Sequence, residues 1–246
     1  MKKLSDEQVE AFDREYVDEN RFARICQKLD SDFPDGQFSF LDVGGGNGCF
    51  CDQLLARYPE AHGTVLDNSE LLLARNRPHA RKSLAFGSAM ELGAIPGTYD
   101  VLALHWLLHH LVGNSYAESR ANQLASLRAV RGMLTERGRV SLFENDYVGW
   151  APDPLPTVAI YHATASKLAA PLAKALGANT AGVGVCFNSR EGWQAMIRES
   201  GLALVDHAEP DNWRRRLHWY TKVFVGLKDV RVGHYWLRSD ASTVHR

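Results

Sequence analysis

Residues 40–50 read Phe-Leu-Asp-Val-Gly-Gly-Gly-Asn-Gly-Cys-Phe. A short apolar run, interrupted only by Asp42, ends at Val43, and four glycines follow within the next five positions. This pattern predicts a buried parallel strand that stops abruptly at a turn into a helix. Glycine allows positive φ and, because it lacks a Cβ, lets a ligand lie directly against the backbone. The stretch therefore predicts a ligand-binding loop in an α/β protein, with a plain tight turn as the alternative.

The glycine spacing excludes two classes of nucleotide site. A dinucleotide fingerprint needs G-x-G-x-x-G, and with Gly44 and Gly46 as its first two glycines the third position falls on Cys49. The phosphate-binding pattern G-x-x-x-x-G-K-[ST] is absent from the sequence. The pattern that is present is G-x-G-x-G with Asp42 two residues before Gly44, and it resembles the first motif of the class I S-adenosylmethionine-dependent methyltransferases.

That resemblance implies a fold and a cofactor. The fold is a doubly wound, seven-stranded, mostly parallel Rossmann-like α/β sheet with an antiparallel last strand and a helical cap insertion. The cofactor is S-adenosyl-L-methionine, with S-adenosyl-L-homocysteine as product, and its ammonium group would be attracted by Asp42. Asp67 lies 19 residues beyond Gly48 at the predicted end of the second strand, where a carboxylate can accept both ribose hydroxyls. We assign Asn68 to the same site, and an exposed strand-end aspartate is the alternative for Asp67.

The adenine contacts are expected after the third predicted strand, residues 83–86. Methyltransferases of this class usually have an acidic residue followed by Ala there, and this chain has Ser88-Ala89-Met90. A hydroxyl can still hydrogen-bond adenine, although a simple turn role for Ser88 is equally compatible with the sequence.

The fourth predicted strand, residues 99–104, leads into His-Trp-Leu-Leu-His-His-Leu at 105–111, which resembles the fourth motif of the family. We expect His105 to line the cofactor and to lie nearest the reacting centre, where a histidine can take a proton from a hydroxyl or an amine. Lining without proton transfer is the alternative. Adjacent histidines on a helix diverge by about 100°, so His109 and His110 cannot both face one metal ion. We expect no metal, and we assign His109 to the substrate site.

Polar residues follow the fifth predicted strand, residues 140–143. Glu144 and Tyr147 are predicted to act with His105 on the acceptor, and Asn145 to contact it. Asn145-Asp146 could suggest the metal pair of catechol-type methyltransferases, but those enzymes place a carboxylate where this chain has His105.

We expect residues 1–246 to form one domain. Residues 1–30 are predicted to be an N-terminal helical lid in which Tyr16 contacts the substrate, with a helix packed on the sheet edge as the alternative. Residues 149–186 are predicted to be a cap insertion in which Trp150 and Tyr161 line the acceptor site, unless the segment is a surface hairpin or a dimer contact. The last two strands are predicted at 202–205 and 218–227 as an antiparallel pair.

The composition excludes several partners. A formal net charge of −1 over 246 residues gives no field that attracts nucleic acid, and no apolar run approaches the length of a membrane span. The four cysteines have no zinc or disulfide spacing. We expect a cytoplasmic monomer or homodimer that acts on a small molecule.

The predicted function is methyl transfer to an oxygen or nitrogen, less readily a carbon, of a small aromatic or heterocyclic metabolite, such as those of secondary metabolism. The alternatives are a methyltransferase of RNA or protein and an S-adenosylmethionine-binding protein that does not methylate. The sequence lacks the Asn/Asp-Pro-Pro-Tyr/Phe and Pro-Cys motifs of nucleic-acid methyltransferases.

Overall fold

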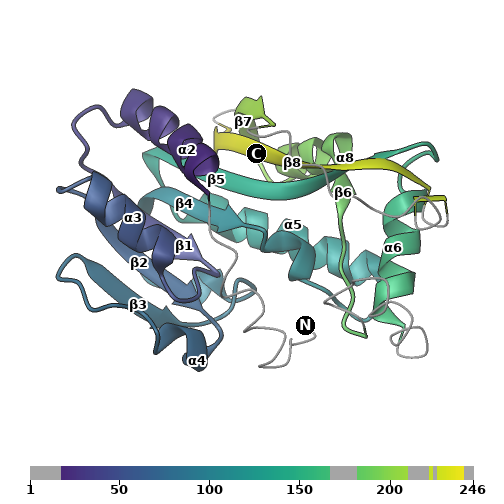
Figure 1. Ribbon diagram of the computed structural model, residues 1–246, viewed down its shortest axis with the longest axis horizontal. Coiled ribbons are helices and arrows are strands. Elements are labelled where there is room, and N and C mark those ends of the chain that lie inside the picture. Colours follow the sequence, from purple (N-terminus) through teal and green to yellow (C-terminus); the bar gives the residue numbers. More distant parts are fainter. Residues whose placement is uncertain (1–17, 167–181, 210–221, 224–225, 241–246) are drawn as a thin grey trace.

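The computed structural model describes residues 18–166, 182–209, 222–223 and 226–240, and Figure 1 shows their arrangement. Within these ranges, no helix combines the length and the apolar character needed to cross a membrane.

A central sheet organises the described residues, with strands in the order β3-β2-β1-β4-β5-β8-β7 and the short β6 paired with β5. β1, β2, β3, β4 and β5 are mutually parallel, whereas β8 is antiparallel to both β5 and β7. The strands are β1 Ser39–Val43, β2 His62–Asp67, β3 Lys82–Phe86, β4 Tyr99–His105, β5 Leu134–Gly149, β6 Asn188–Ser189, β7 Leu202–Ala208 and β8 Leu227–Ser239. The predicted α/β fold with an antiparallel last strand is confirmed.

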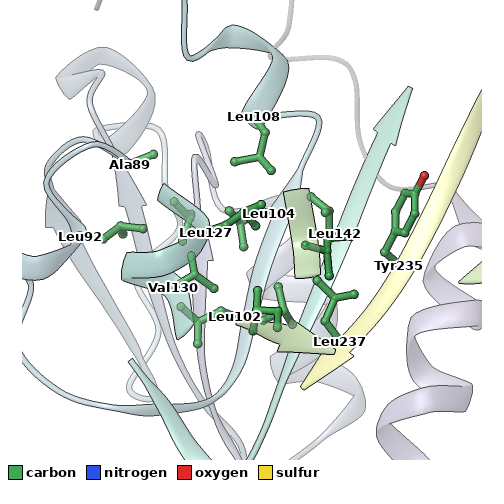
Figure 2. Packing of buried hydrophobic residues seen from close by; sticks show 14 of the residues in the cluster. Ala89, Leu92, Leu102, Leu104, Leu108, Leu127, Val130, Leu142, Tyr235 and Leu237 are labelled. Atoms are coloured by element: carbon green, nitrogen blue, oxygen red, sulfur yellow. The ribbon is translucent and has the colours of Figure 1, made fainter. Parts of the chain in front are cut away.

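Helices cover both faces of the sheet. They are α2 Glu19–Asp32, α3 Cys49–Arg57, α4 Glu70–Leu73, α5 Tyr116–Gly132, α6 Leu155–Ala165 and α8 Arg190–Glu199, with short 3₁₀ helices η1 Leu92–Ala94 and η2 Leu108–His110. Side chains alternate across a strand, so neighbouring residues enter different cores. Phe143 of β5 packs in the cluster that contains residues of α2 and α3, whereas Leu142 packs with residues of α5 and α8. Figure 2 shows the second cluster.

The last strand was predicted in the wrong place. β8 runs over Leu227–Ser239, whereas the prediction was 218–227; residues 222–223 are helical, and 218–221 lie outside the described residues. The alternating apolar pattern at 218–227 indicated a half-exposed edge strand. β8 instead lies between β5 and β7 and is buried on both faces, so its sequence shows a continuous buried run over 232–237 rather than an alternation.

β5 is much longer than predicted. It begins at Leu134, one residue after α5 ends at Gly132, and not at the predicted residue 140. It also continues to Gly149, because β8 pairs with it from Val140 onward. The polar residues predicted to follow the strand therefore lie within it. As a consequence, the side chains of Glu144 and Asn145 leave the sheet on opposite faces.

Helix α2, Glu19–Asp32, covers the described end of the predicted helical lid at residues 1–30. The carboxylate of Asp18 caps α2 by accepting a hydrogen bond from the Arg21 N–H at 3.0 Å. α2 buries Ile25, Cys26 and Leu29 against the sheet. Residues 1–17 lie outside the described residues, and with them the predicted lid residue Tyr16.

Candidate functional site

The glycine loop joins β1 to α3 at the carboxyl edge of the sheet. Gly44, Gly46 and Gly48 all have positive φ, at 74°, 54° and 74°, a conformation that L side chains rarely adopt. The loop is fixed to β2, because the N–H groups of Gly44 and Gly45 both donate to the Leu66 carbonyl, at 2.7 and 3.2 Å. The positive φ angles of the backbone thus require glycine at all three positions of the G-x-G-x-G pattern.

Gly45 is needed for a different reason, which the sequence pattern did not reveal. A Cβ at this position would lie 2.4 Å from Oδ2 of Asp42 and 2.9 Å from Cγ1 of Val65. The Asp42 side chain therefore lies directly beneath the loop. The signal in the sequence was the fourth glycine, at a position that the motif leaves variable.

Asp42 is the most perturbed acid of this loop. It is 3% exposed, and within the described residues its Oδ2 has no hydrogen-bond partner. Burial, with a smaller contribution from the charge of Asp67, raises the pKa of Asp42 to about 7. A buried carboxylate oxygen without a donor is suited to a cationic or hydrogen-bonding ligand group.

Asp67 lies where β2 ends and connects the two neighbouring loops. Its Oδ2 accepts the Gly46 N–H at 3.0 Å, and its Oδ1 accepts the Ser69 N–H at 2.8 Å. Burial raises the pKa of Asp67, although these backbone bonds act in the opposite direction. Each oxygen keeps a second lone pair for a ligand. Asn68, beside it, is exposed.

The predicted adenine segment lies next to Asp67. Phe86, the last residue of β3, pairs in register with Asp67, and the Gly87 N–H donates to the Asp67 carbonyl at 3.0 Å. In the following turn the Ser88 hydroxyl accepts the Met90 N–H at 3.2 Å, while Ala89 is buried. The structure thus brings together the glycine loop, Asp67 and the segment at 88–90.

His105 ends β4 in an enclosed position. Its ring meets Phe50 and Phe143 edge-on, with ring centroids 4.7 and 5.2 Å away. Its Nε2 is 3.1 Å from the Ser141 hydroxyl, which lies 3.1 Å from Nε2 of His234. Burial lowers the pKa of His105 to about 3, so the ring is neutral at physiological pH.

Trp106 follows His105 and has an unusual backbone. Its φ is 51°, in the left-handed region that a bulky residue rarely adopts. The indole stacks on Phe143 at 5.3 Å between ring centroids, and the Arg21 guanidinium lies 4.8 Å over it. This turn also approaches the glycine loop, because a Cβ on Gly44 would be 2.9 Å from a methyl carbon of Leu107.

His109 and Glu144 form a buried pair on the other face of the sheet. His109 Nδ1 is 2.7 Å from Glu144 Oε2, and the two residues are 5% and 0% exposed. The second carboxylate oxygen accepts the Leu108 N–H at 2.7 Å and the His109 N–H at 3.3 Å. A carboxylate oxygen accepts hydrogen bonds, so this contact favours the tautomer with the hydrogen on Nδ1, in which Nε2 is the acceptor.

The structure joins the predicted catalytic residues differently from the sequence-based grouping. Glu144 contacts His109, which was predicted only as a substrate residue, and it does not share a face with His105, because His105 is in register with Phe143. Tyr147 donates its hydroxyl to Asp153 Oδ1 at 2.6 Å, and burial together with that carboxylate raises its pKa. Tyr147 is thus a phenol bound to the cap segment.

The cap residues differ in their placement. Trp150 is 56% exposed, whereas Tyr161 is buried and donates to the Gly113 carbonyl at 3.1 Å. Asn145 is buried, and within the part of the chain that the structure describes its Oδ1 has no partner. α6 is attached to the segment opposite His109, because Thr164 Oγ1 accepts the Val185 N–H at 3.0 Å.

Comparison with known proteins agrees with this fold. Residues 41–142 match the model of a family described as a methyltransferase domain, and comparison with curated proteins gave no match. The mitomycin 7-O-methyltransferase MmcR is similar with a TM-score of 0.55 and 16% identity, over 89% of this chain and 56% of that chain. TnmH is similar with a TM-score of 0.54 and 20% identity, over 89% of this chain and 57% of that chain. CalO1 is a methyltransferase in calicheamicin biosynthesis whose structure was solved with S-adenosylhomocysteine. It is similar with a TM-score of 0.50 and 18% identity, over 93% of this chain and 58% of that chain.

The chain spans a little more than half of the length of these three proteins. The match and the structural neighbours confirm the class I methyltransferase fold that the glycine motif predicted.

Proposed function

We propose that the chain binds S-adenosylmethionine and transfers its methyl group to an oxygen or nitrogen, less readily a carbon, of a small aromatic or heterocyclic metabolite. The match of residues 41–142 to the model of a methyltransferase domain supports this function. The observation that carries the proposal is the buried His109–Glu144 pair beside the ends of β4 and β5. It supplies a proton acceptor at the edge of the sheet where ligands bind in open α/β folds.

The chain's own residues fit the cofactor. The free Oδ2 of Asp42 suits an ammonium group, and the glycine loop leaves room for a ligand against its backbone. Asp67 can accept from ribose hydroxyls. We assign the adenosine contacts to Asn68, Ser88, Ala89 and Met90, and the lining of the cofactor next to β4 to His105.

When bound, the cofactor supplies an electrophilic methyl group on a positively charged sulfur. The protein's part is to hold the acceptor atom in line with that group and to remove its proton. Orientation of two reactants is worth about 7–11 kcal/mol in well-aligned systems, and a general base contributes roughly 10²–10⁴-fold. His109 takes the acceptor's proton at Nε2, and Glu144 stabilises the resulting imidazolium through Nδ1.

His105 is proposed as a neutral lining residue rather than as the base. A histidine whose pKa is about 3 is protonated in roughly one molecule in 10⁴ at pH 7, and taking up a proton in this enclosed position is costly. Glu144 acts through His109. Tyr147 has a raised pKa and a bond to Asp153, so we assign it a supporting role in holding the cap segment.

The acceptor is proposed to be flat and small. The His109 ring packs against two other rings, with the centroids of His110 and Phe187 at 4.0 and 4.8 Å, so planar groups are already accommodated here. Asn145, Trp150 and Tyr161 are proposed as further contacts of the acceptor. Two of the similar structures are described by natural products, mitomycin and calicheamicin, which supports a biosynthetic metabolite as the acceptor.

Two measurements test the proposal. Calorimetry should show micromolar binding of S-adenosylmethionine and S-adenosylhomocysteine, and the absence of both would refute the proposed cofactor. A panel of phenols and nitrogen heterocycles should then yield a methylated product. With that acceptor, His109→Gln should lose roughly 10²–10⁴-fold in kcat. His62→Gln, at an exposed histidine where β2 begins, serves as the matched control and should be unaffected.

Binding of the cofactor without transfer to any acceptor would favour the non-methylating alternative. Transfer only to RNA or protein would favour the macromolecular one.

A further inference from the structure

We infer that Gln123, on helix α5, is a positioning residue that fixes the ring orientation and tautomer of His109; this inference rests on the proposed function, in which His109 receives the acceptor's proton. Gln123 is 0% exposed and lies in none of the motifs that indicate the cofactor site. A fully buried amide must place its donors and acceptor against partners, or it destabilises the fold.

The donors of Gln123 join the two chain segments that flank His109. Nε2 donates to the Leu108 carbonyl at 3.1 Å and to the Cys186 carbonyl at 2.7 Å. Leu108 immediately precedes His109, and its N–H donates to Glu144. The Cys186 N–H in turn donates to the His109 carbonyl at 3.0 Å. The Gln123 amide and this backbone hydrogen bond together hold η2 beside the segment at 185–187.

That separation determines where the His109 ring lies. Phe187, next to Cys186, packs on one side of the ring, with 4.8 Å between centroids and planes tilted by 30°. The opposite side is set by η2, which also carries the backbone N–H groups bound to Glu144. If either segment moves, the ring shifts relative to the carboxylate, and the 2.7 Å bond that selects the Nδ1–H tautomer weakens.

The orientation of the Gln123 side-chain amide is fixed by a further hydrogen bond at its oxygen. Oε1 of Gln123 accepts the side-chain amide of Asn188 at 3.2 Å, and the Asn188 oxygen accepts from Arg120 at 2.7 Å. The Gln123 side-chain oxygen thus accepts one hydrogen bond, and its NH₂ group donates two. A glutamate would present an acceptor to two carbonyl oxygens, and an apolar residue would leave both carbonyls without this donor.

The test reads the tautomer of His109 directly. Long-range ¹H–¹⁵N spectra of the 246-residue chain saturated with S-adenosylhomocysteine distinguish the Nδ1–H from the Nε2–H form, and His109→Gln identifies the signals. The variants are Gln123→Met, which removes the amide, and Gln123→Asn, which withdraws it by one methylene. Ser126→Ala is the matched control: Ser126 lies on the same helix, is 1% exposed, and its hydroxyl has no partner among the described residues.

In the wild type and in Ser126→Ala we expect the Nδ1–H form to dominate. In the two Gln123 variants the ratio of tautomers should change by about tenfold toward Nε2–H, since the bond to Glu144 weakens. The affinity for S-adenosylhomocysteine should stay within about twofold, because the glycine loop shares no partner with Gln123. If Gln123→Asn keeps the wild-type tautomer ratio, the inference is overturned. This holds even where Gln123→Met does not fold.

The inference and the proposed function fail separately. Full methyl transfer by His109→Gln would remove the base while leaving the tautomer result in place. Unchanged tautomers in the Gln123 variants would remove the positioning role and leave His109 as the base.

Discussion

The two halves of the sheet's carboxyl edge are built in different ways. On the side of β1, β2 and β3, the glycine loop, Asp67 and the turn at 88–90 come from one contiguous stretch, and most of their contacts are to the backbone. On the side of β4 and β5, the His109–Glu144 pair depends on contacts among η2, β5, α5 and the segment at 185–187. A donor site can thus be encoded locally, whereas the acceptor side is assembled from distant segments.

Replacing Glu144 by Ala should give the largest effect and should separate the two halves. It leaves Nδ1 of His109 and the Leu108 N–H buried without their acceptor, at a cost of about 3–5 kcal/mol in the free energy of unfolding. Urea unfolding measures this loss, and calorimetry measures binding of S-adenosylhomocysteine. We expect the affinity to stay within about twofold, because sites without shared partners contribute independently. A parallel loss of affinity would contradict the division into two halves.

The converse change is Gly45→Ala on the donor side. Its Cβ would displace Asp42 or Val65, at a cost of about 1–3 kcal/mol, and would weaken binding of S-adenosylhomocysteine by about tenfold. Gly93→Ala is the control, because a Cβ there has no atom within 4 Å. The tautomer of His109 should be unchanged in both variants. If Gly45→Ala binds as tightly as Gly93→Ala, the contact between the loop and Asp42 does not support the donor site.

The same contrast explains which features could be predicted from the sequence. The glycine loop depends on residues that are neighbours in the sequence, and the structure confirms the predicted turn. The caps formed by Ser69 at α4 and Ser189 at α8 are equally local. β8 was misplaced because its burial comes from β5 and β7, which its own pattern does not reveal.

The partner of Glu144 could not be predicted for a related reason. The sequence indicated a strand that ended at Phe143, so the polar residues after it had no assigned face. Pairing with β8 extends β5, and the strict alternation of a strand then directs Glu144 toward His109 and away from His105. Gln123 gave no signal at all, because a glutamine within an amphipathic helix usually indicates an exposed position.

The next largest effect is expected in the pH dependence of S-adenosylhomocysteine binding, which tests Asp42 in the half built from β1, β2 and β3. The pKa of Asp42 is about 7 when folded and near 3.8 when unfolded, so the folded state holds the extra proton between these values. The free energy of unfolding therefore falls as pH rises through this window. An ammonium group binds the ionised form, so affinity for S-adenosylhomocysteine should rise by about fivefold between about pH 6 and 7.

Asp42→Asn should weaken both trends. Its stability should fall less steeply over this window, because Asp67 and Asp146 also have a raised pKa, and calorimetry should show weaker binding that varies little with pH. A variant that keeps the wild-type pH profile would assign the titration to another group.

The smallest effect is expected at α2, where Arg21 connects the helix to the turn after β4. Arg21→Met removes the guanidinium that lies 4.8 Å over Trp106, an interaction worth about 0.5–1 kcal/mol. Arg57→Met is the control, because Arg57 stacks on Tyr58 at 5.3 Å but is far more exposed, with 55% of its side chain accessible against 13% for Arg21. Since the Trp106–Leu107 turn contacts the glycine loop, Arg21→Met should also weaken S-adenosylhomocysteine binding by about threefold, whereas Arg57→Met should not. Equal behaviour of the two variants would mean that α2 stabilises the fold without supporting the donor half.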